Sequence, residues 1–217
     1  MNRAVLLLWV AASCTSDVQF PGATGVGNPG SLKQVLAPGS EVTVTQAEVY
    51  TEAIEVRRCT EDPFVVEINA SVDLLGDTRS PADGGLWCSV EVSWRPPLVV
   101  SGAAENGEPG KGTLELELDI GQLSLVPTVQ PFVDKTALII ELGSPGWFGK
   151  ESLGLEDGVH VLVEAGHPLH DAFALEVEIG SALYVDADAD GVISAAERAA
   201  GPVAAGPLHT PDDPDDD

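Results

Sequence analysis

Three aspartates at alternate positions, Asp186, Asp188 and Asp190, are the residues of this chain best suited to chemistry. Carboxylate oxygens are ligands that hard cations such as Ca²⁺ prefer. Gly191 follows directly, and glycine is favoured where the chain turns through a backbone region that disfavours a Cβ atom. The pattern indicates a calcium-binding turn. The alternative is an acidic turn without a metal, because the chain as a whole is strongly acidic.

Residues 186–197 resemble the calcium loop of EF-hand proteins. That family takes its oxygen ligands from loop positions 1, 3, 5, 7, 9 and 12 and has glycine at position 6. The resemblance implies Ca²⁺ as the bound ion, with a dissociation constant on the order of 10⁻⁴–10⁻³ M as in extracellular modules. The ligands it implies are Asp186, Asp188, Asp190, the carbonyl of Val192, Ser194 and a bidentate Glu197.

The segments on either side of the loop depart from the EF-hand pattern. Upstream, apolar residues of 173–179 alternate with Ala or Glu, which predicts a strand where the family has a helix. Downstream, Ser194 and Glu197 form an S-x-x-E capping pattern that predicts a short helix ending at Gly201. Arg198 stands where the family usually has an apolar residue. The resemblance therefore covers the loop and a short exit helix, as in strand-loop-helix calcium loops of secreted bacterial proteins.

The N-terminal residues predict export. An apolar run over residues 4–12 is too short to span a bilayer but fits a signal peptide. Residues 11–14, Ala-Ala-Ser-Cys, resemble the lipobox of bacterial lipoproteins. The resemblance implies cleavage after residue 13, a lipidated Cys14 and an outer-membrane location in the cell envelope, on either its periplasmic or its surface face. The alternative is an ordinary cleaved signal peptide in which Cys14 has no role.

The remaining cysteines, Cys59 and Cys88, predict a disulfide, because two cysteines in an exported chain usually pair. Two buried free thiols are the alternative. Their separation does not match a C-x-x-C redox motif or a zinc knuckle.

The charge of the chain limits its partners. The formal net charge of −25 argues against nucleic acid and anionic lipid surfaces. We therefore expect membrane contact through the lipid anchor only, and a cell-envelope protein or a glycan as the possible partner.

The hydrophobic pattern predicts a mainly β fold. From about residue 41, short segments alternate apolar and polar residues between turn signals, most clearly in 114–120. We expect an antiparallel β-sandwich of the Greek-key or immunoglobulin-like type. The expected organisation is a lipoprotein signal peptide (1–13), a flexible tether (14–40), a β-sandwich domain carrying the calcium loop (41–200) and a disordered acidic tail (201–217).

Two other groups of residues could form sites. His160, His167 and His170 could share a metal in a hydrolase, although histidines of surface turns are the more ordinary interpretation. The aromatic residues of 87–94 and 147–148 could form a sugar-binding platform or could lie in the core. Trp87, Trp94, Trp147 and Phe148 make up this second group.

No set of catalytic residues can be assigned from the sequence. The chain has no G-x-S-x-G motif, and its scattered carboxylates do not define a pair for glycoside hydrolysis. We therefore expect a calcium-binding, lipid-anchored exported protein with a non-catalytic structural or adhesive role. A carbohydrate- or peptide-binding module is the first alternative and a metal-dependent hydrolase the second.

Overall fold

The computed structural model describes residues 30–59, 62–82, 85–104, 112–128, 132–133 and 137–207. The expected signal peptide, Cys14, most of the expected tether and residues 208–217 lie outside these ranges. No helix in the described part of the chain is long and apolar enough to cross a membrane.

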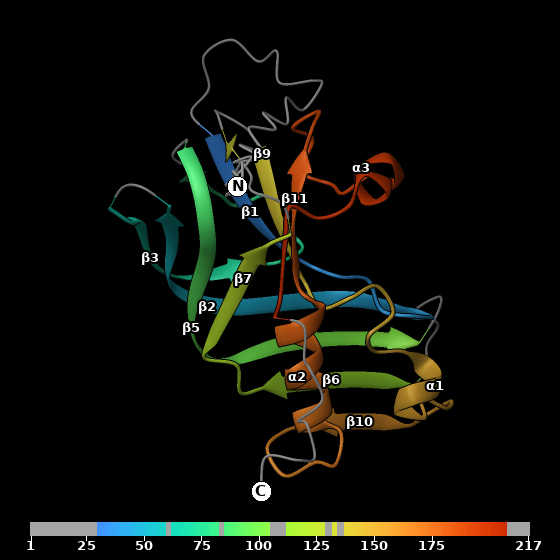
Figure 1. The fold of residues 1–217 in the computed structure, drawn as a ribbon. Coiled ribbons are helices and arrows are strands. Elements are labelled where there is room, and N and C mark those ends of the chain that lie inside the picture. Colours follow the sequence, from blue (N-terminus) through green and yellow to red (C-terminus); the bar gives the residue numbers. More distant parts are fainter. Residues whose placement is uncertain are drawn as a thin grey trace, which may run out of the picture.

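The described chain is mainly β, as predicted, and Figure 1 shows the arrangement of its elements. The strands are β1 (Gly30–Leu36), β2 (Val42–Arg58), β3 (Phe64–Asp73), β4 (Arg79–Ala82), β5 (Gly85–Ala104), β6 (Thr113–Leu118), β7 (Gln122–Pro127), β8 (Phe132–Val133), β9 (Ala137–Leu142), β10 (His160–Val163), β11 (Ala182–Asp186) and β12 (Ala204–Ala205). The helices are α1 (Lys150–Leu153), α2 (His170–Gly180) and α3 (Ala195–Ala200).

The strands form one large, strongly curved mixed sheet. Its main path runs β10-β6-β5-β7-β12-β11-β9-β1-β4, with β2 on β5, β3 on β2 and β8 on β5. The pairs β1–β9 and β6–β10 are parallel, so the expectation of a wholly antiparallel sheet is wrong. A two-sheet sandwich and Greek-key connections are not confirmed. Alternation along a strand reports which side chains are buried, but it carries no information on the direction of the neighbouring strand.

The curvature of the sheet comes largely from β5. Its segment Val90–Ser93 pairs with β7, whereas Leu98–Ala103 pairs with β6. The change of partner occurs around Pro96 and Pro97, and prolines usually interrupt a strand. Instead the strand bends and continues, because β2 follows it along its length through several register shifts. Figure 1 shows β5 turning sharply between these two directions.

Part of the expected tether belongs to the folded body. Strand β1 lies between β9 and β4, with Leu32 and Leu36 in the core. Gln34 is also buried: its amide nitrogen donates to Thr51 Oγ1 at 3.2 Å, and its oxygen accepts from Trp94 Nε1 at 3.1 Å. These bonds tie β1 to β2 and β5 across the interior. The tether boundary at residue 40 is therefore wrong for residues 30–36.

The start of the expected tail is folded as well. Val203 and Ala204 are buried, and β12 pairs with both β11 and β7. Residues 203–205 thus close the sheet between these two strands. The glycines and prolines that suggested disorder here mark turns around a short strand.

The strand predicted over residues 173–179 is wrong, because this segment lies within α2. His170, Phe173 and Val177 are its buried side chains, and their spacing of three and four residues is that of one helix face. Leu175, which a strand would bury with its alternate neighbours, is exposed. Two residues four positions apart lie on the same face of either a strand or a helix, so the alternation did not distinguish the two. Helix α2 packs against β6 and β9, and it lies in front of the lower strands in Figure 1.

The predicted disulfide is present. Cys59 follows the end of β2 and is bonded to Cys88 of the neighbouring strand β5. The link closes a loop with a sequence separation of 29 residues. It fixes the β2–β5 pair, the longest in the sheet, at the end where β2 finishes and β5 begins.

Replacing both cysteines, as in Cys59→Ser/Cys88→Ser, is expected to lower the free energy of unfolding by about 3 kcal/mol, since the unfolded chain regains the freedom that the loop removes. Neither position is fully buried, so the serine hydroxyls of the variant can still reach solvent. Urea unfolding measures the loss, and reduced wild type is the matched control. A midpoint that neither treatment moves would contradict the expectation.

Candidate metal centre

Asp186 is the residue around which the loop is built. It is the last residue of β11, paired in register with Ala137 of β9, and its side chain is only 1% exposed. Its Oδ1 accepts a hydrogen bond from Asp190 N at 3.1 Å, and its Oδ2 accepts from Gly191 N at 2.9 Å. The buried carboxylate therefore draws the following residues back over the end of its own strand.

The three predicted aspartates come together. One carboxylate oxygen from each of Asp186, Asp188 and Asp190 lies within 4.8 Å of the others. Oxygens on opposite sides of a Ca²⁺ ion lie roughly 4.6–5.2 Å apart, because each is about 2.3–2.6 Å from the metal. The three residues thus fit a divalent cation, without selecting Ca²⁺ in particular. Asp188 and Asp190 are exposed, so the cluster opens to solvent.

The backbone of the loop adopts two left-handed conformations. Gly191 has φ of 82°, which glycine accepts without penalty. Ala189 has φ of 57°, a conformation that costs an L-residue about 1–2 kcal/mol. The hydrogen bonds to Asp186 offset this cost. Such an outlier, held by its surroundings, is a common property of binding loops.

Glu197 closes the loop but is not part of the aspartate cluster. Its Oε1 accepts from Ala187 N at 2.6 Å, and its Oε2 accepts from Ser194 N at 2.7 Å. Ser194 is the N-cap of α3, with its Oγ accepting from Glu197 N at 3.3 Å, so the predicted capping box is confirmed. The ligand roles of Glu197, Ser194 and the Val192 carbonyl stay predictions.

Two cations on the sheet also hold the loop, and no pattern in the sequence indicated them. Arg79 Nη1 lies 3.6 Å from Asp186 Oδ2, and Arg79 Nη2 donates to the carbonyl of Ala189 at 3.2 Å. Lys33 Nζ donates to the carbonyl of Gly191 at 2.9 Å. All three contacts join residues more than a hundred positions apart, so no local pattern could reveal them.

Asp77 links the same two cations from the solvent side. Its Oδ1 lies 3.3 Å from Lys33 Nζ and 3.2 Å from Arg79 Nε. The hydrogen bonds from Arg79 and then from Lys33 lower the pKa of the Asp77 carboxyl below its ordinary value. For Asp186 burial dominates and raises the pKa, with Asp190 and Glu197 adding to the rise and the Gly191 amide and Arg79 opposing it. A bound cation would favour the charged form of Asp186.

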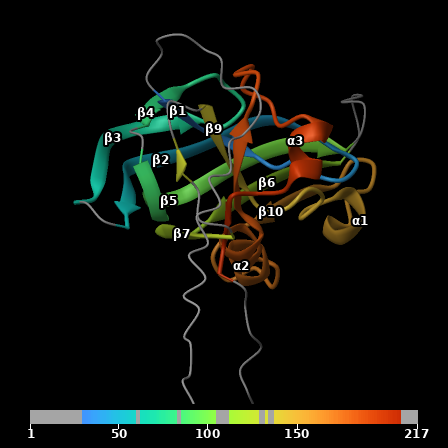
Figure 2. The same cartoon turned by 45° about the horizontal axis from the view of Figure 1, so that its top comes forward.

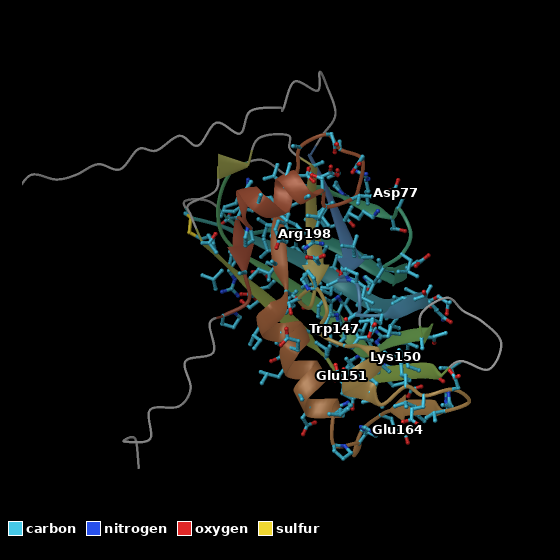
Figure 3. The ribbon with its side chains drawn as sticks, turned by 90° about the vertical axis from the view of Figure 1, so that its right-hand side faces the viewer. Asp77, Trp147, Lys150, Glu151, Glu164 and Arg198 are labelled. Atoms are coloured by element: carbon cyan, nitrogen blue, oxygen red, sulfur yellow. A yellow bond between two sulfur atoms is a disulfide. The ribbon has the colours of Figure 1, made fainter. Side chains whose placement is uncertain are left out.

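The far end of the loop is fixed by Arg198. Its Nη1 donates to Glu141 Oε2 at 2.7 Å, and its Nη2 donates to Glu141 Oε1. Glu141 lies on β9 and is only 2% exposed, and this partner raises the pKa of Arg198. The pair explains why an arginine replaces the apolar residue expected after the loop. Figure 3 shows Asp77 and Arg198 toward the end of the molecule that carries the loop, away from Glu164.

The three histidines do not gather around a metal. His160 Nδ1 contacts Thr113 Oγ1 at 2.9 Å, and His167 Nδ1 accepts from Leu169 N at 3.2 Å. His170 is buried, with Asp171 at its Nδ1 and the Asp119 amide at its Nε2. Among the described residues, the aspartate cluster is the only group of three or more His, Cys, Asp or Glu side chains with metal-binding spacing.

The large aromatic side chains lie in the core and form no exposed platform. Trp87, Trp94, Trp147 and Phe148 are all buried. Trp147 packs edge-on against Phe148 and Phe173, with ring centroids 4.7 and 5.7 Å away. The core interpretation of these residues is therefore correct.

Comparison of the chain with protein-family models, with curated protein sequences and with solved structures finds no match in any of the three. The chemistry of the site therefore rests on its own geometry.

Gly191→Ala is expected to destabilise the protein more than Gly158→Ala. The two glycines have similar φ of 82° and 78°, so both substitutions carry a left-handed penalty of about 1 kcal/mol. A Cβ atom at Gly158 meets nothing within 4 Å, whereas at Gly191 it would lie 2.6 Å from Arg79 Nη2. Displacing Arg79 adds about 1 kcal/mol or more through the lost charged hydrogen bond. Equal losses in chemical denaturation would contradict this account of the loop.

Arg198→Met is expected to lower the free energy of unfolding by about 2–3 kcal/mol, because it leaves the buried Glu141 charge without a partner. Arg198 is about one-third exposed, which keeps the loss below that of a fully buried pair. Adding Glu141→Gln to Arg198→Met removes the stranded charge and is expected to restore most of the stability. A double variant as unstable as the single one would show that packing, not charge, is what Arg198 supplies.

Proposed function

We propose that this protein is an exported, lipid-anchored β-domain protein whose loop 186–197 binds one Ca²⁺, and that its role is structural or adhesive without catalysis. The observation that carries the proposal is the convergence of Asp186, Asp188 and Asp190 within 4.8 Å on a loop already turned by Gly191. A random acidic turn would not combine this convergence with a capped exit helix.

The proposed ion would bind the loop to the rest of the domain. Asp186 would supply a ligand from the end of β11, while Asp188 and Asp190 would supply two from the exposed side. Glu197, Ser194 and the Val192 carbonyl are the further oxygen donors of the proposal. An ion that binds the folded chain but not the unfolded one stabilises the fold by mass action.

The open geometry favours Ca²⁺ over Mg²⁺ in this proposal. Ca²⁺ accepts six to eight oxygens in a flexible arrangement, whereas Mg²⁺ demands a near-ideal octahedron and keeps several waters. Two of the three carboxylates are exposed, which leaves room for further oxygen ligands from solvent. We propose a structural site filled outside the cell, because among the described elements the loop adjoins one short helix, and no helix pair of the kind that opens in calcium sensors accompanies it there.

The cell-envelope location rests on sequence and cysteine chemistry. The lipobox-like residues 11–14 and the apolar run before them support export and lipidation of Cys14, with attachment to the outer membrane. The Cys59–Cys88 disulfide fits an oxidising compartment. A cell-envelope protein or a glycan is the partner class that we propose.

No second function has a specific observation in its favour. The carbohydrate-binding alternative depended on exposed tryptophans, and these side chains are buried. The hydrolase alternative depended on a histidine cluster, and His160, His167 and His170 each bond elsewhere.

Thermal unfolding in EDTA, in 10 mM calcium and in 10 mM magnesium tests the calcium proposal. At a dissociation constant of 10⁻⁴–10⁻³ M, calcium is expected to add about 1.4–2.7 kcal/mol and to raise the melting temperature by roughly 3–10 °C. Magnesium is expected to have little effect. Asp188→Ala removes one exposed ligand and is expected to abolish the rise.

Asp119→Ala is the matched control, since Asp119 is an exposed aspartate outside the loop. It is expected to leave the calcium response unchanged. A wild type that melts at the same temperature in EDTA and in calcium would contradict the proposal. An equal loss of the calcium-induced rise in both variants would show that calcium acts through the general charge of the protein and not through the loop.

A further inference from the structure

Two like charges lie side by side on the outer face of the sheet beneath the loop. Lys33 of β1 is the direct register partner of Arg79 in the antiparallel pair β1–β4. Side chains of directly paired residues point to the same face, about 4.5–5.5 Å apart at Cβ, and like charges there are destabilising. Lys33 is also largely buried, with a side chain 10% exposed. This cation pair therefore requires negative partners close by.

The loop supplies most of those partners. The registers β1–β9 and β9–β11 place Lys33, Ile139, Tyr184 and then Asp186 on one face of three neighbouring strands. The loop leaves β11 at Asp186 and turns back across this face. Its Asp186 carboxylate and the carbonyl of Ala189 meet Arg79, and the carbonyl of Gly191 meets Lys33.

The contact is close enough that a larger residue at Gly191 would displace the ends of the side chains beneath the loop. A Cβ atom built on Gly191 would lie 2.6 Å from Arg79 Nη2, 3.0 Å from Lys33 Nζ and 3.0 Å from Asp77 Oδ1. The Gly191 backbone thus rests directly on the ion-paired group. Figure 2, with the top of the molecule brought forward, shows β1, β4 and β9 neighbouring one another at this side.

We propose that Lys33 and Arg79 are internal counter-cations of the acidic loop, which hold it closed without a metal and weaken the binding of a divalent ion. In this arrangement Arg79 already neutralises part of the Asp186 charge. A divalent ion entering the cluster meets the repulsion of two fixed positive charges. The second part of the inference rests on the proposed calcium function; the first part does not.

Arg79→Gln tests both parts in the full-length protein, because glutamine keeps a polar amide on a similar aliphatic stem and removes the charge. Amide hydrogen exchange in EDTA tests the first part, that the two cations hold the loop closed without a metal. The Asp190 and Gly191 amides, which donate to Asp186, are expected to exchange roughly 3- to 10-fold faster in Arg79→Gln. Calcium titration of the same variant reads the second part, with binding expected to tighten on the order of 3- to 10-fold.

Arg57→Gln is the matched control. Arg57 also pairs with two carboxylates, Glu55 and Glu91, on an exposed part of the sheet. It is expected to change neither the exchange of the loop amides nor the calcium affinity. Lys33→Gln is the second variant; it is expected to speed exchange at Gly191, because Lys33 holds that carbonyl.

The outcomes separate this inference from the proposed function. Unchanged loop exchange in both Arg79→Gln and Lys33→Gln would overturn the counter-cation role, whatever calcium does. Faster exchange with weaker calcium binding would overturn the competition and make Arg79 a positioning residue. Faster exchange with no calcium binding in any variant, wild type included, would support the counter-cations and refute the calcium function.

Discussion

The burial of one carboxylate governs the loop end of this structure. Asp186 sits at the end of a strand with almost no exposure, and a buried charge is costly unless hydrogen bonds and an opposite charge compensate it. The amides of Asp190 and Gly191 and the guanidinium of Arg79 supply that compensation. The two amides donate to Asp186 from a loop that turns through left-handed conformations at Ala189 and Gly191. The shape of the loop is thus a consequence of where its first aspartate lies.

The sheet holds the loop at both ends. At the start, Lys33 and Arg79 of β1 and β4 contact its carboxylate and carbonyl oxygens; at the end, Arg198 of α3 pairs with Glu141 of β9. Strand β9 lies between β1 and β11, and its residues from Leu138 to Leu142 are buried on both faces. The loop is therefore a cover over the outer face of a central strand. An ion in the aspartate cluster would reinforce packing that the side-chain charges have already arranged.

The features that could be predicted from the sequence are local in the chain. The aspartate spacing, Gly191, the Ser194–Glu197 capping box and the disulfide were all recognisable, because each depends on residues close together or on simple pairing of two cysteines. The partners Lys33 and Arg79 were not, since strand register brings them to the loop from more than a hundred residues away.

Other differences also come from tertiary context. The alternating segment 173–179 was compatible with both a strand and a helix, and packing against the core favours the helix. The Gly- and Pro-rich ends suggested a tether and a tail, yet β1 and β12 complete the sheet within them. The parallel pairing of β1 with β9 and of β6 with β10 joins segments far apart in the chain, and it is what separates this mixed sheet from the expected antiparallel sandwich.

The measurement that tests the account most directly is a calcium titration of the ¹⁵N-labelled protein followed by NMR. The amides of Asp190 and Gly191 report on the Asp186 carboxylate, to which both donate. The account predicts that their resonances, and those of the rest of 186–197, shift together and saturate as a single site at millimolar calcium or below. Shifts spread without saturation over the acidic surface, or none in the loop, would contradict it.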